Sequence, residues 1–123
     1  MDIQVFLFLA IMFSKHFLAD YPLQNAYMLR KTDPDNWLLP LITHCLIHSI
    51  FTFVISSIMF GFYIGACIAA TDGLNHFIID MFKARSLKAK FGSKLFWTFL
   101  GFDQYLHALS YLGLAFIISV NAA

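Results

Sequence analysis

The sequence contains very few charged residues and no glutamate at all. Only 12% of its 123 residues are charged, whereas a soluble domain has about 25%. Hydrophobic residues make up 60% of the chain. This composition excludes an ordinary soluble domain and predicts an integral membrane protein. A formal net charge of +1 gives no indication of nucleic acid, so we expect no such partner. The length predicts a single domain, residues 1–123.

Cysteines and processing signals are also scarce. Cys45 and Cys67 form no CxxC pair, which disfavours a disulfide or a thiolate metal site. We expect both to act as small apolar residues. The chain begins Met1-Asp2 without a basic region and without a clear small-residue cleavage site. We therefore expect no cleaved signal peptide.

Long apolar runs predict four membrane spans, at about residues 3–20, 37–60, 62–82 and 96–120. The predicted fold is an all-α bundle of four transmembrane helices. In this arrangement every Lys and Arg falls on one side of the membrane: Lys15, Arg30, Lys31, Lys83, Arg85, Lys88, Lys90 and Lys94. The positive-inside rule makes that side cytoplasmic. We therefore predict a multi-pass protein of the inner membrane, surrounded by the lipid bilayer, with both termini outside.

Small residues recur at every fourth position in the third span. Gly65, Ala69 and Gly73 form this stripe, and Gly61 precedes it. Such spacing lets helix backbones approach closely in a bilayer. The stripe predicts a packing seam within the chain, or alternatively the contact surface of a homo-oligomer.

Ionisable residues four positions apart occur in each of the four spans. Residues at this spacing share one helix face. With a rise of about 1.5 Å per residue, antiparallel spans place all of them in one layer in the cytoplasmic half. The nine are His16 and Asp20, His44 and His48, Asp72, His76 and Asp80, and Asp103 and His107.

Ionisable groups inside a membrane are costly and usually mark function. A structural polar network, a proton or ion pathway and a bis-histidine haem site are three alternatives. A metal site is favoured, because imidazole plus carboxylate suits Zn, Mn or Fe. One ion needs three or four protein ligands. Nine candidates therefore favour two divalent ions, Zn foremost, or one ion with carboxylates that orient its histidines.

Roles can be assigned to individual side chains on this hypothesis. The predicted metal ligands are His16, Asp20, His44, His48, Asp72, His76 and His107. Asp80 and Asp103 are the predicted catalytic groups, as bridging ligands, general base or supports of the ligands. Lys83 and Arg85 could hold an anionic head group, although topology and lipid-surface charge explain them as well. Gln24, Asn75 and Gln104 could support the ligands by hydrogen bonding.

The motifs also resemble a known family. They are HFLADYPLQ at 16–24, the HxxxH of His44 and His48, DxxxHxxxD followed by Lys83, and DQYLH at 103–107. Together they resemble domain of unknown function 3307, a family of small bacterial and phage membrane proteins. That family is similar to LexA-regulated, membrane-bound metal-dependent hydrolases. The resemblance implies a four-span helical fold and a hydrolytic metal site, with no established substrate.

The predicted function is therefore a membrane-embedded, metal-dependent hydrolase that acts at the cytoplasmic side on a lipid or phosphate ester. A metal-bound water would supply hydroxide at neutral pH. The alternative is a metal- or proton-binding transport or sensing protein without hydrolytic activity. Between the layer and the outer face, spans two and three offer only mild polar groups: Ser49, Thr52, Ser56, Ser57 and Tyr63. Their lack of an ionisable relay argues against a path through the membrane.

Overall fold

The structure, a computed structural model, describes residues 3–86 and 88–121. Five α-helices and one short 3-10 helix form its secondary structure, and these residues contain no strand. The elements are α1 (Ile3–Asp20), α2 (Ala26–Leu29), η1 (Arg30–Thr32), α3 (Leu38–Phe60), α4 (Phe62–Ser86) and α5 (Lys94–Asn121). The predicted all-helical class is confirmed.

Three of the four predicted spans match helix limits closely, but α4 continues one turn beyond residue 82. Its last turn contains Lys83 and Arg85, and cations there interact favourably with the C-terminal end of the helix dipole. The short helices α2 and η1 in the first connector were not predicted. Asn25 caps α2 by accepting a hydrogen bond from the Met28 N–H at 3.0 Å, a common way to begin a short helix.

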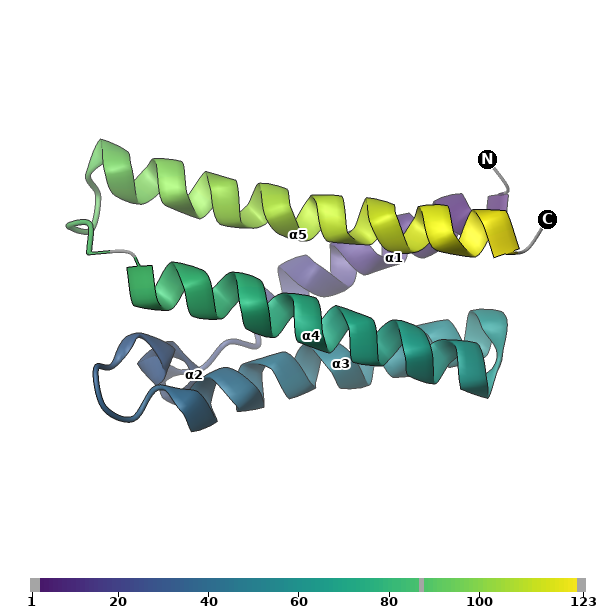
Figure 1. Cartoon of the computed structure of the whole chain (residues 1–123), viewed down its shortest axis with the longest axis horizontal. Helices are drawn as coiled ribbons and strands as arrows, with labels where there is room; N and C mark the ends of the chain where they lie inside the picture. Colours follow the sequence, from purple (N-terminus) through teal and green to yellow (C-terminus); the bar gives the residue numbers. More distant parts are fainter. Residues whose placement is uncertain (1–2, 87, 122–123) are drawn as a thin grey trace.

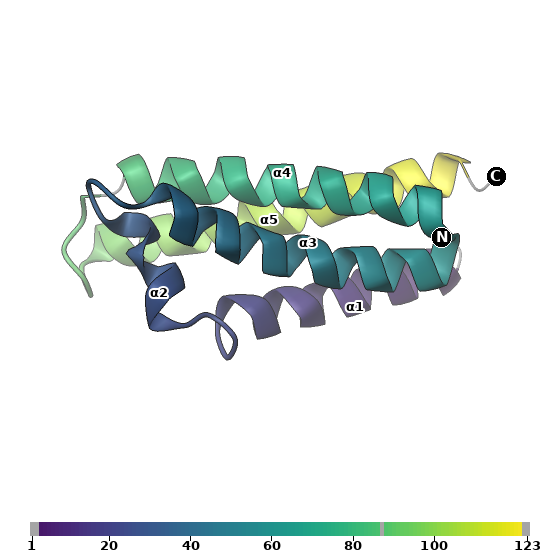
Figure 2. The same cartoon turned by 90° about the horizontal axis from the view of Figure 1, so that it is seen from below.

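The four long helices lie side by side along the long axis of the molecule (Figures 1 and 2). Contacts join α1 to α3, α3 to α4, α4 to α5 and α5 back to α1, and each neighbouring pair is antiparallel. The α3–α4 interface is the most extensive of the four, and the α1–α5 interface is the least. Both chain ends and the α3–α4 turn lie at one end of the molecule, and the other connectors lie at the opposite end (Figure 1).

Close packing of α3 on α4 depends on glycine. Gly61 forms the turn with φ of +89°, a conformation that residues with a Cβ rarely adopt. A Cβ on Gly65 would lie 2.6 Å from the backbone nitrogen of Ser57, and one on Gly73 would lie 2.7 Å from Ser49 Oγ. The predicted packing seam is therefore confirmed, with α3 as its partner.

The interior has an apolar half and a polar half. The apolar cluster fills the half that contains the chain ends; its members are Val5, Phe8, Leu9, Met12, Ile68, Tyr111, Leu114, Ala115 and Ile118. The ionisable residues occupy the other half. Exposed hydrophobic side chains cover all four long helices, with Ile58 81% and Phe116 68% exposed. A hydrophobic surface around a polar interior is typical of a protein surrounded by lipid.

Three helices, α1, α3 and α4, are long and apolar enough to cross a membrane. The longer helix α5 is not among them. Its assignment as a fourth span stays a prediction.

Candidate metal centre

All nine ionisable residues of the predicted layer meet between the four long helices. Helix periodicity brings the members of each pair to one face, and antiparallel packing brings the four faces together. Eight are buried, and the Asp20 side chain is 11% exposed. The eight are His16, His44, His48, Asp72, His76, Asp80, Asp103 and His107.

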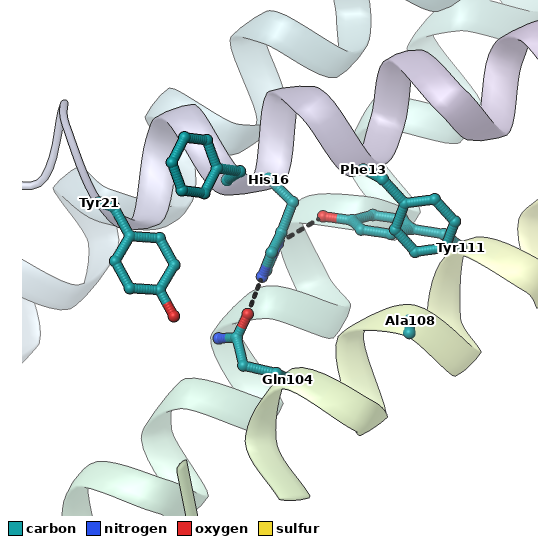
Figure 3. Close-up of a pocket in the computed structure, with 7 residues that line it drawn as sticks. Phe13, His16, Tyr21, Gln104, Ala108 and Tyr111 are labelled. Carbon is teal, nitrogen blue, oxygen red and sulfur yellow. Dashed lines mark hydrogen bonds between the residues drawn. The ribbon is translucent and has the colours of Figure 1, made fainter. Parts of the chain in front are cut away.

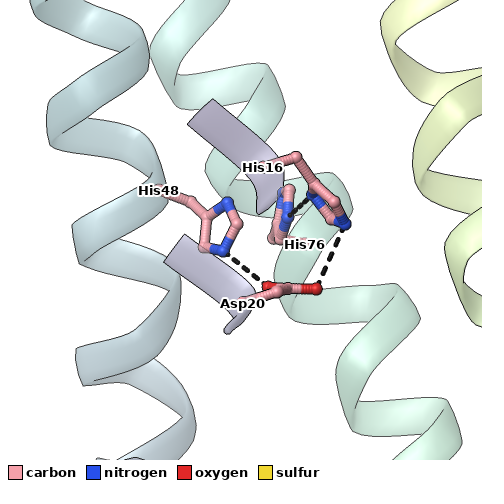
Figure 4. A group of neighbouring side chains, drawn as sticks. All are labelled: His16, Asp20, His48 and His76. Carbon is pink, nitrogen blue, oxygen red and sulfur yellow. Dashed lines mark hydrogen bonds and ion pairs between the residues drawn. The ribbon is translucent and has the colours of Figure 1, made fainter. Parts of the chain in front are cut away.

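Four of these side chains form the first candidate ion site (Figure 4). This four-residue group consists of His16, Asp20, His48 and His76, whose ligand atoms all lie within 4.8 Å of one another. Asp20 Oδ1 lies 2.9 Å from His48 Nε2, and Asp20 Oδ2 lies 3.1 Å from His16 Nε2. His76 Nε2 lies 3.3 Å from His16 Nδ1. Three imidazoles and one carboxylate match the ligand number and types of a tetrahedral Zn site.

A second, three-residue group consists of Asp80, Asp103 and His107, and its ligand atoms also lie within 4.8 Å of one another. His107 Nε2 is 3.1 Å from Asp80 Oδ1 and 3.6 Å from Asp103 Oδ1. The two groups are neighbours, because the His76 and His107 rings stack with centroids 4.2 Å apart. Three protein ligands with an open position are typical of a catalytic ion site.

His44 lies between the two groups and belongs to neither. Its Nε2 is 3.2 Å from Asp20 Oδ1 and 3.3 Å from Asp80 Oδ2. These short distances lack hydrogen-bond geometry, and both His44 nitrogens are buried without a hydrogen-bond partner. Asp103 Oδ1 and His107 Nδ1 are buried in the same state. Buried polar atoms are rarely left without a hydrogen-bond partner. These nitrogen and oxygen atoms therefore fit a site in which a bound cation would be their partner.

Asp72, a predicted ligand, lies outside both groups. Its Oδ1 is 3.2 Å from His76 Nδ1, on the side of the ring away from the four-residue group. Its Oδ2 accepts hydrogen bonds from Lys15 Nζ at 2.8 Å and from Thr52 Oγ1 at 2.5 Å. A carboxylate in this position fixes the tautomer and orientation of a ligand histidine. The geometry therefore favours Asp72 as a support of His76.

Three lysines penetrate the layer and pair with aspartates, and these pairings were not predicted. Lys15 Nζ pairs with Asp72, Lys31 Nζ lies 2.5 Å from Asp80 Oδ2, and Lys83 Nζ lies 2.7 Å from Asp103 Oδ2. Each lysine takes the Oδ2 atom and leaves Oδ1 facing a histidine. A cation within a span was itself a signal for Lys15. No local spacing connects Lys31 with Asp80, because 49 positions separate them.

Gln104 and Tyr111 complete the surroundings of His16. The Gln104 amide nitrogen donates to Asp20 Oδ2 at 3.1 Å and to Asp103 Oδ2 at 3.2 Å. Its oxygen lies 3.0 Å from His16 Nε2, so Gln104 contacts a predicted ligand, and its supporting role stays a prediction. The Tyr111 hydroxyl, which was not predicted, lies 2.9 Å from His16 Nδ1.

The other two amides predicted to support the ligands have different partners. Gln24 donates to the backbone oxygen of Asp20 at 2.8 Å. Asn75 donates to Ser110 Oγ at 2.8 Å. Asn75 therefore joins α4 to α5 beside the layer and makes this contact with a hydroxyl group.

The two residues predicted to bind substrate have intramolecular partners. Lys83 is paired with Asp103, as described above. The Arg85 guanidinium lies 5.0 Å from the centroid of the Trp37 ring. It also donates to the backbone oxygens of Asp33 and Pro34 at 3.4 Å. Their role in holding a head group stays a prediction.

Comparison with known proteins gives one result. The family model for "Protein of unknown function (DUF3307)" matches residues 7–122. No curated protein and no solved structure gives a significant match. The match covers almost the whole chain, so this chain belongs to the DUF3307 family.

Proposed function

We propose that this member of the DUF3307 family is a four-span inner-membrane protein and a metal-dependent hydrolase that binds two divalent cations. The four-residue group carries the proposal, because its three imidazoles and one carboxylate converge within 4.8 Å. The neighbouring three-residue group offers the second position. Zn fits these ligand types, and Mn and Fe are alternatives.

The chain's own residues have separable roles in this proposal. His16, Asp20, His48 and His76 would hold one ion; Asp80, Asp103 and His107 would hold the other, with His44 between them. A bound ion would lower the pKa of a coordinated water to about 7 and polarise the oxygen of a carbonyl or phosphoryl group. Asp103 Oδ1 is buried without a hydrogen-bond partner, so it is the Asp103 oxygen that could bind the second ion, or accept a proton from water if Asp80 and His107 hold that ion without it. Lys83 holds the other oxygen of that carboxylate.

The proposed placement in the membrane rests on the location of the basic residues at one end of the bundle. Helix α5 runs beside α1 and α4 and presents exposed hydrophobic residues such as Leu112 and Ile117. We infer that it forms the fourth span. The connectors that contain the basic residues would lie in the cytoplasm. The metal layer would then lie in the cytoplasmic half of the membrane, and both termini would lie outside.

A transport or sensing protein is the second candidate. Lysine–aspartate pairs and stacked histidines, such as His48 and His76 with ring centroids 3.7 Å apart, are also the components of proton pathways. Between this layer and the chain ends, however, the described interior consists of the apolar cluster that contains Phe8 and Met12, and its buried polar residues, Thr52 and Ser56, are not ionisable. A path through the membrane would have to cross that cluster, so the hydrolase is favoured.

Metal analysis of protein purified without chelator tests the proposal. We expect near-stoichiometric Zn, Mn or Fe by mass spectrometry and hydrolysis of bis(4-nitrophenyl) phosphate or a 4-nitrophenyl ester. His48→Ala and His76→Ala should each lower metal affinity by about tenfold or more, since even supporting groups contribute that much. Lys88→Ala, at an exposed position outside the helices, is the control.

Two results would reject the proposal at different levels. If the purified protein contains no metal and Zn, Mn or Fe gives no thermal stabilisation, the layer is a structural network or a proton path. If metal binds but no ester or phosphate is hydrolysed, the metal site stands and the hydrolase does not.

A further inference from the structure

A groove on the flank of the molecule is lined by His16, one member of the four-residue group (Figure 3). It lies between α1 and α5, the least extensive interface of the ring. Its volume is about 390 Å³, and its lining includes Phe13, His16, Phe17, Gln104 and Tyr111. The groove therefore connects a predicted metal ligand with the surface that would face the bilayer.

The lining changes from apolar to polar with depth. Phe13 and Phe17 are 43% and 58% exposed and form the outer wall. His16 is only 7% exposed, and its nitrogens contact the Tyr111 hydroxyl and the Gln104 amide oxygen in the interior. A site with this gradient suits an amphiphile whose chain lies along the aromatic rings and whose polar linkage reaches the imidazole.

The end of the bundle that contains the α1–α3 and α4–α5 connectors offers a less direct route to the layer of ionisable residues. A cavity of about 250 Å³ at that end is lined by Gln24, Lys31 and Lys83, but by none of the nine ionisable residues of the layer. Lys31 and Lys83 are bound to Asp80 and Asp103 there. A water-soluble substrate that entered by this route would have to displace two ion pairs, of which Lys31–Asp80 is buried and Lys83–Asp103 is partly buried.

The expected depth of the groove in the membrane fits a lipid substrate. Asp20 is the last residue of α1, and Tyr21, which lines the groove, follows it directly. Tyrosine at a helix end is typical of the membrane–water interface, where the ester and phosphate linkages of lipids lie. The mouth of the groove would thus be level with those linkages.

From this geometry we propose that the substrate is a long-chain lipid ester or phosphoester that enters sideways from the bilayer between α1 and α5. The inference rests on the proposed hydrolase function for its chemistry and on the groove for its substrate class. Water would attack the carbonyl carbon or phosphorus beside His16. The bond to the leaving oxygen breaks, and that oxygen takes a proton, which gives an acid and an alcohol.

The test places the protein in phosphatidylcholine vesicles that contain a photoactivatable diazirine-acyl phosphatidylcholine. Ala108 lines the groove, so Ala108→Trp should fill it. Leu109→Trp, at a 44% exposed neighbouring position that does not line the groove, is the matched control. We expect stoichiometric labelling of Phe13, Phe17 or Tyr21 to fall about tenfold in Ala108→Trp, equivalent to about 1.4 kcal/mol of binding free energy. It should be unchanged in Leu109→Trp.

The same variants test the lipid-binding site and the hydrolase activity separately. Metal content and thermal stability are measured for each, and Ala108→Leu replaces Ala108→Trp if the larger residue prevents folding. Equal labelling of the groove in the blocked variant and the control overturns the lipid inference, even if bis(4-nitrophenyl) phosphate is hydrolysed. Loss of labelling in the blocked variant without hydrolysis of any substrate supports the lipid site and rejects the hydrolase.

Discussion

At the scale of single residues, each of three buried carboxylates is divided between two kinds of partner. Asp72, Asp80 and Asp103 each give one oxygen to a lysine and turn the other toward a histidine. An unpaired carboxylate in a low-dielectric interior is very costly. The lysines therefore balance charge. The Asp80 and Asp103 oxygens that face histidines remain available for a cation, while Asp72 Oδ1 holds the His76 ring.

Lys15→Met should destabilise the metal-free protein. The Lys15 ammonium is buried 2.8 Å from Asp72 Oδ2, and loss of one partner of a buried ion pair costs about 3–5 kcal/mol. Unfolding in detergent after chelator treatment measures the change in the free energy of unfolding. Lys88→Met, at an exposed position, is the control and should change it little.

The double variant Lys15→Met/Asp72→Asn tests the cause of that destabilisation. It should recover part of the lost stability, because no uncompensated charge remains in the interior. Equal stability of Lys15→Met and the unaltered chain would show that Asp72 does not depend on this lysine.

At the scale of elements, the α3–α4 hairpin is the most extensively packed pair. Its glycines allow the backbones to approach, and Ser49 donates a hydrogen bond across the seam to the Ala69 oxygen at 2.6 Å. The approach also sets the distance between His48 on α3 and His76 on α4, whose rings stack. Helix packing and the candidate ion site are thus coupled through one seam.

Gly65→Ala should destabilise the protein more than Gly73→Ala. At Gly65 the new Cβ would meet the Ser57 backbone, with the nitrogen at 2.6 Å and Cα at 2.7 Å. At Gly73 the obstacle is the Ser49 side chain, which can rotate. Overpacking of this kind costs about 1–3 kcal/mol, and thermal or denaturant unfolding measures it.

Gly113→Ala in α5 is the matched control for these substitutions. No atom lies within 4 Å of its added Cβ, so we expect no loss of stability and a gain of up to about 1 kcal/mol from helix propensity. If all three variants had the same stability, the α3–α4 seam would not be as close as the structure has it.

At the scale of the whole molecule, the basic residues are concentrated at one of its two ends. The chain ends and the Gly61 turn lie at one end, and the connectors between α1 and α3 and between α4 and α5 lie at the other (Figure 1). These connectors and the helix ends beside them contain seven of the eight basic residues: Arg30, Lys31, Lys83, Arg85, Lys88, Lys90 and Lys94. This asymmetry is the physical basis of the predicted orientation.

A C-terminal alkaline phosphatase fusion should be active, because we predict that the C-terminus lies outside the inner membrane. A C-terminal fluorescent protein that folds only in the cytoplasm should be dark. Fusions after Lys88 should give the opposite pair of results, since the positive-inside rule holds that connector in the cytoplasm. Phosphatase activity after Lys88 with fluorescence at the C-terminus would invert the proposed orientation and move the metal layer to the other half of the membrane.

The sequence by itself determined the four long helices, the shared face of each ionisable pair and the glycine seam, because periodicity and hydrophobicity are local properties of the chain. It also predicted the common depth of the pairs, since antiparallel helices rise by the same amount per residue. Only the tertiary structure decided which partners meet. It divided the layer into a four-residue and a three-residue group, placed His44 between them and put Asp72 behind His76. It also bound Lys31 to Asp80 across 49 positions. Such pairings depend on how helices rotate about their axes and cross, which packing between distant segments sets and local spacing does not.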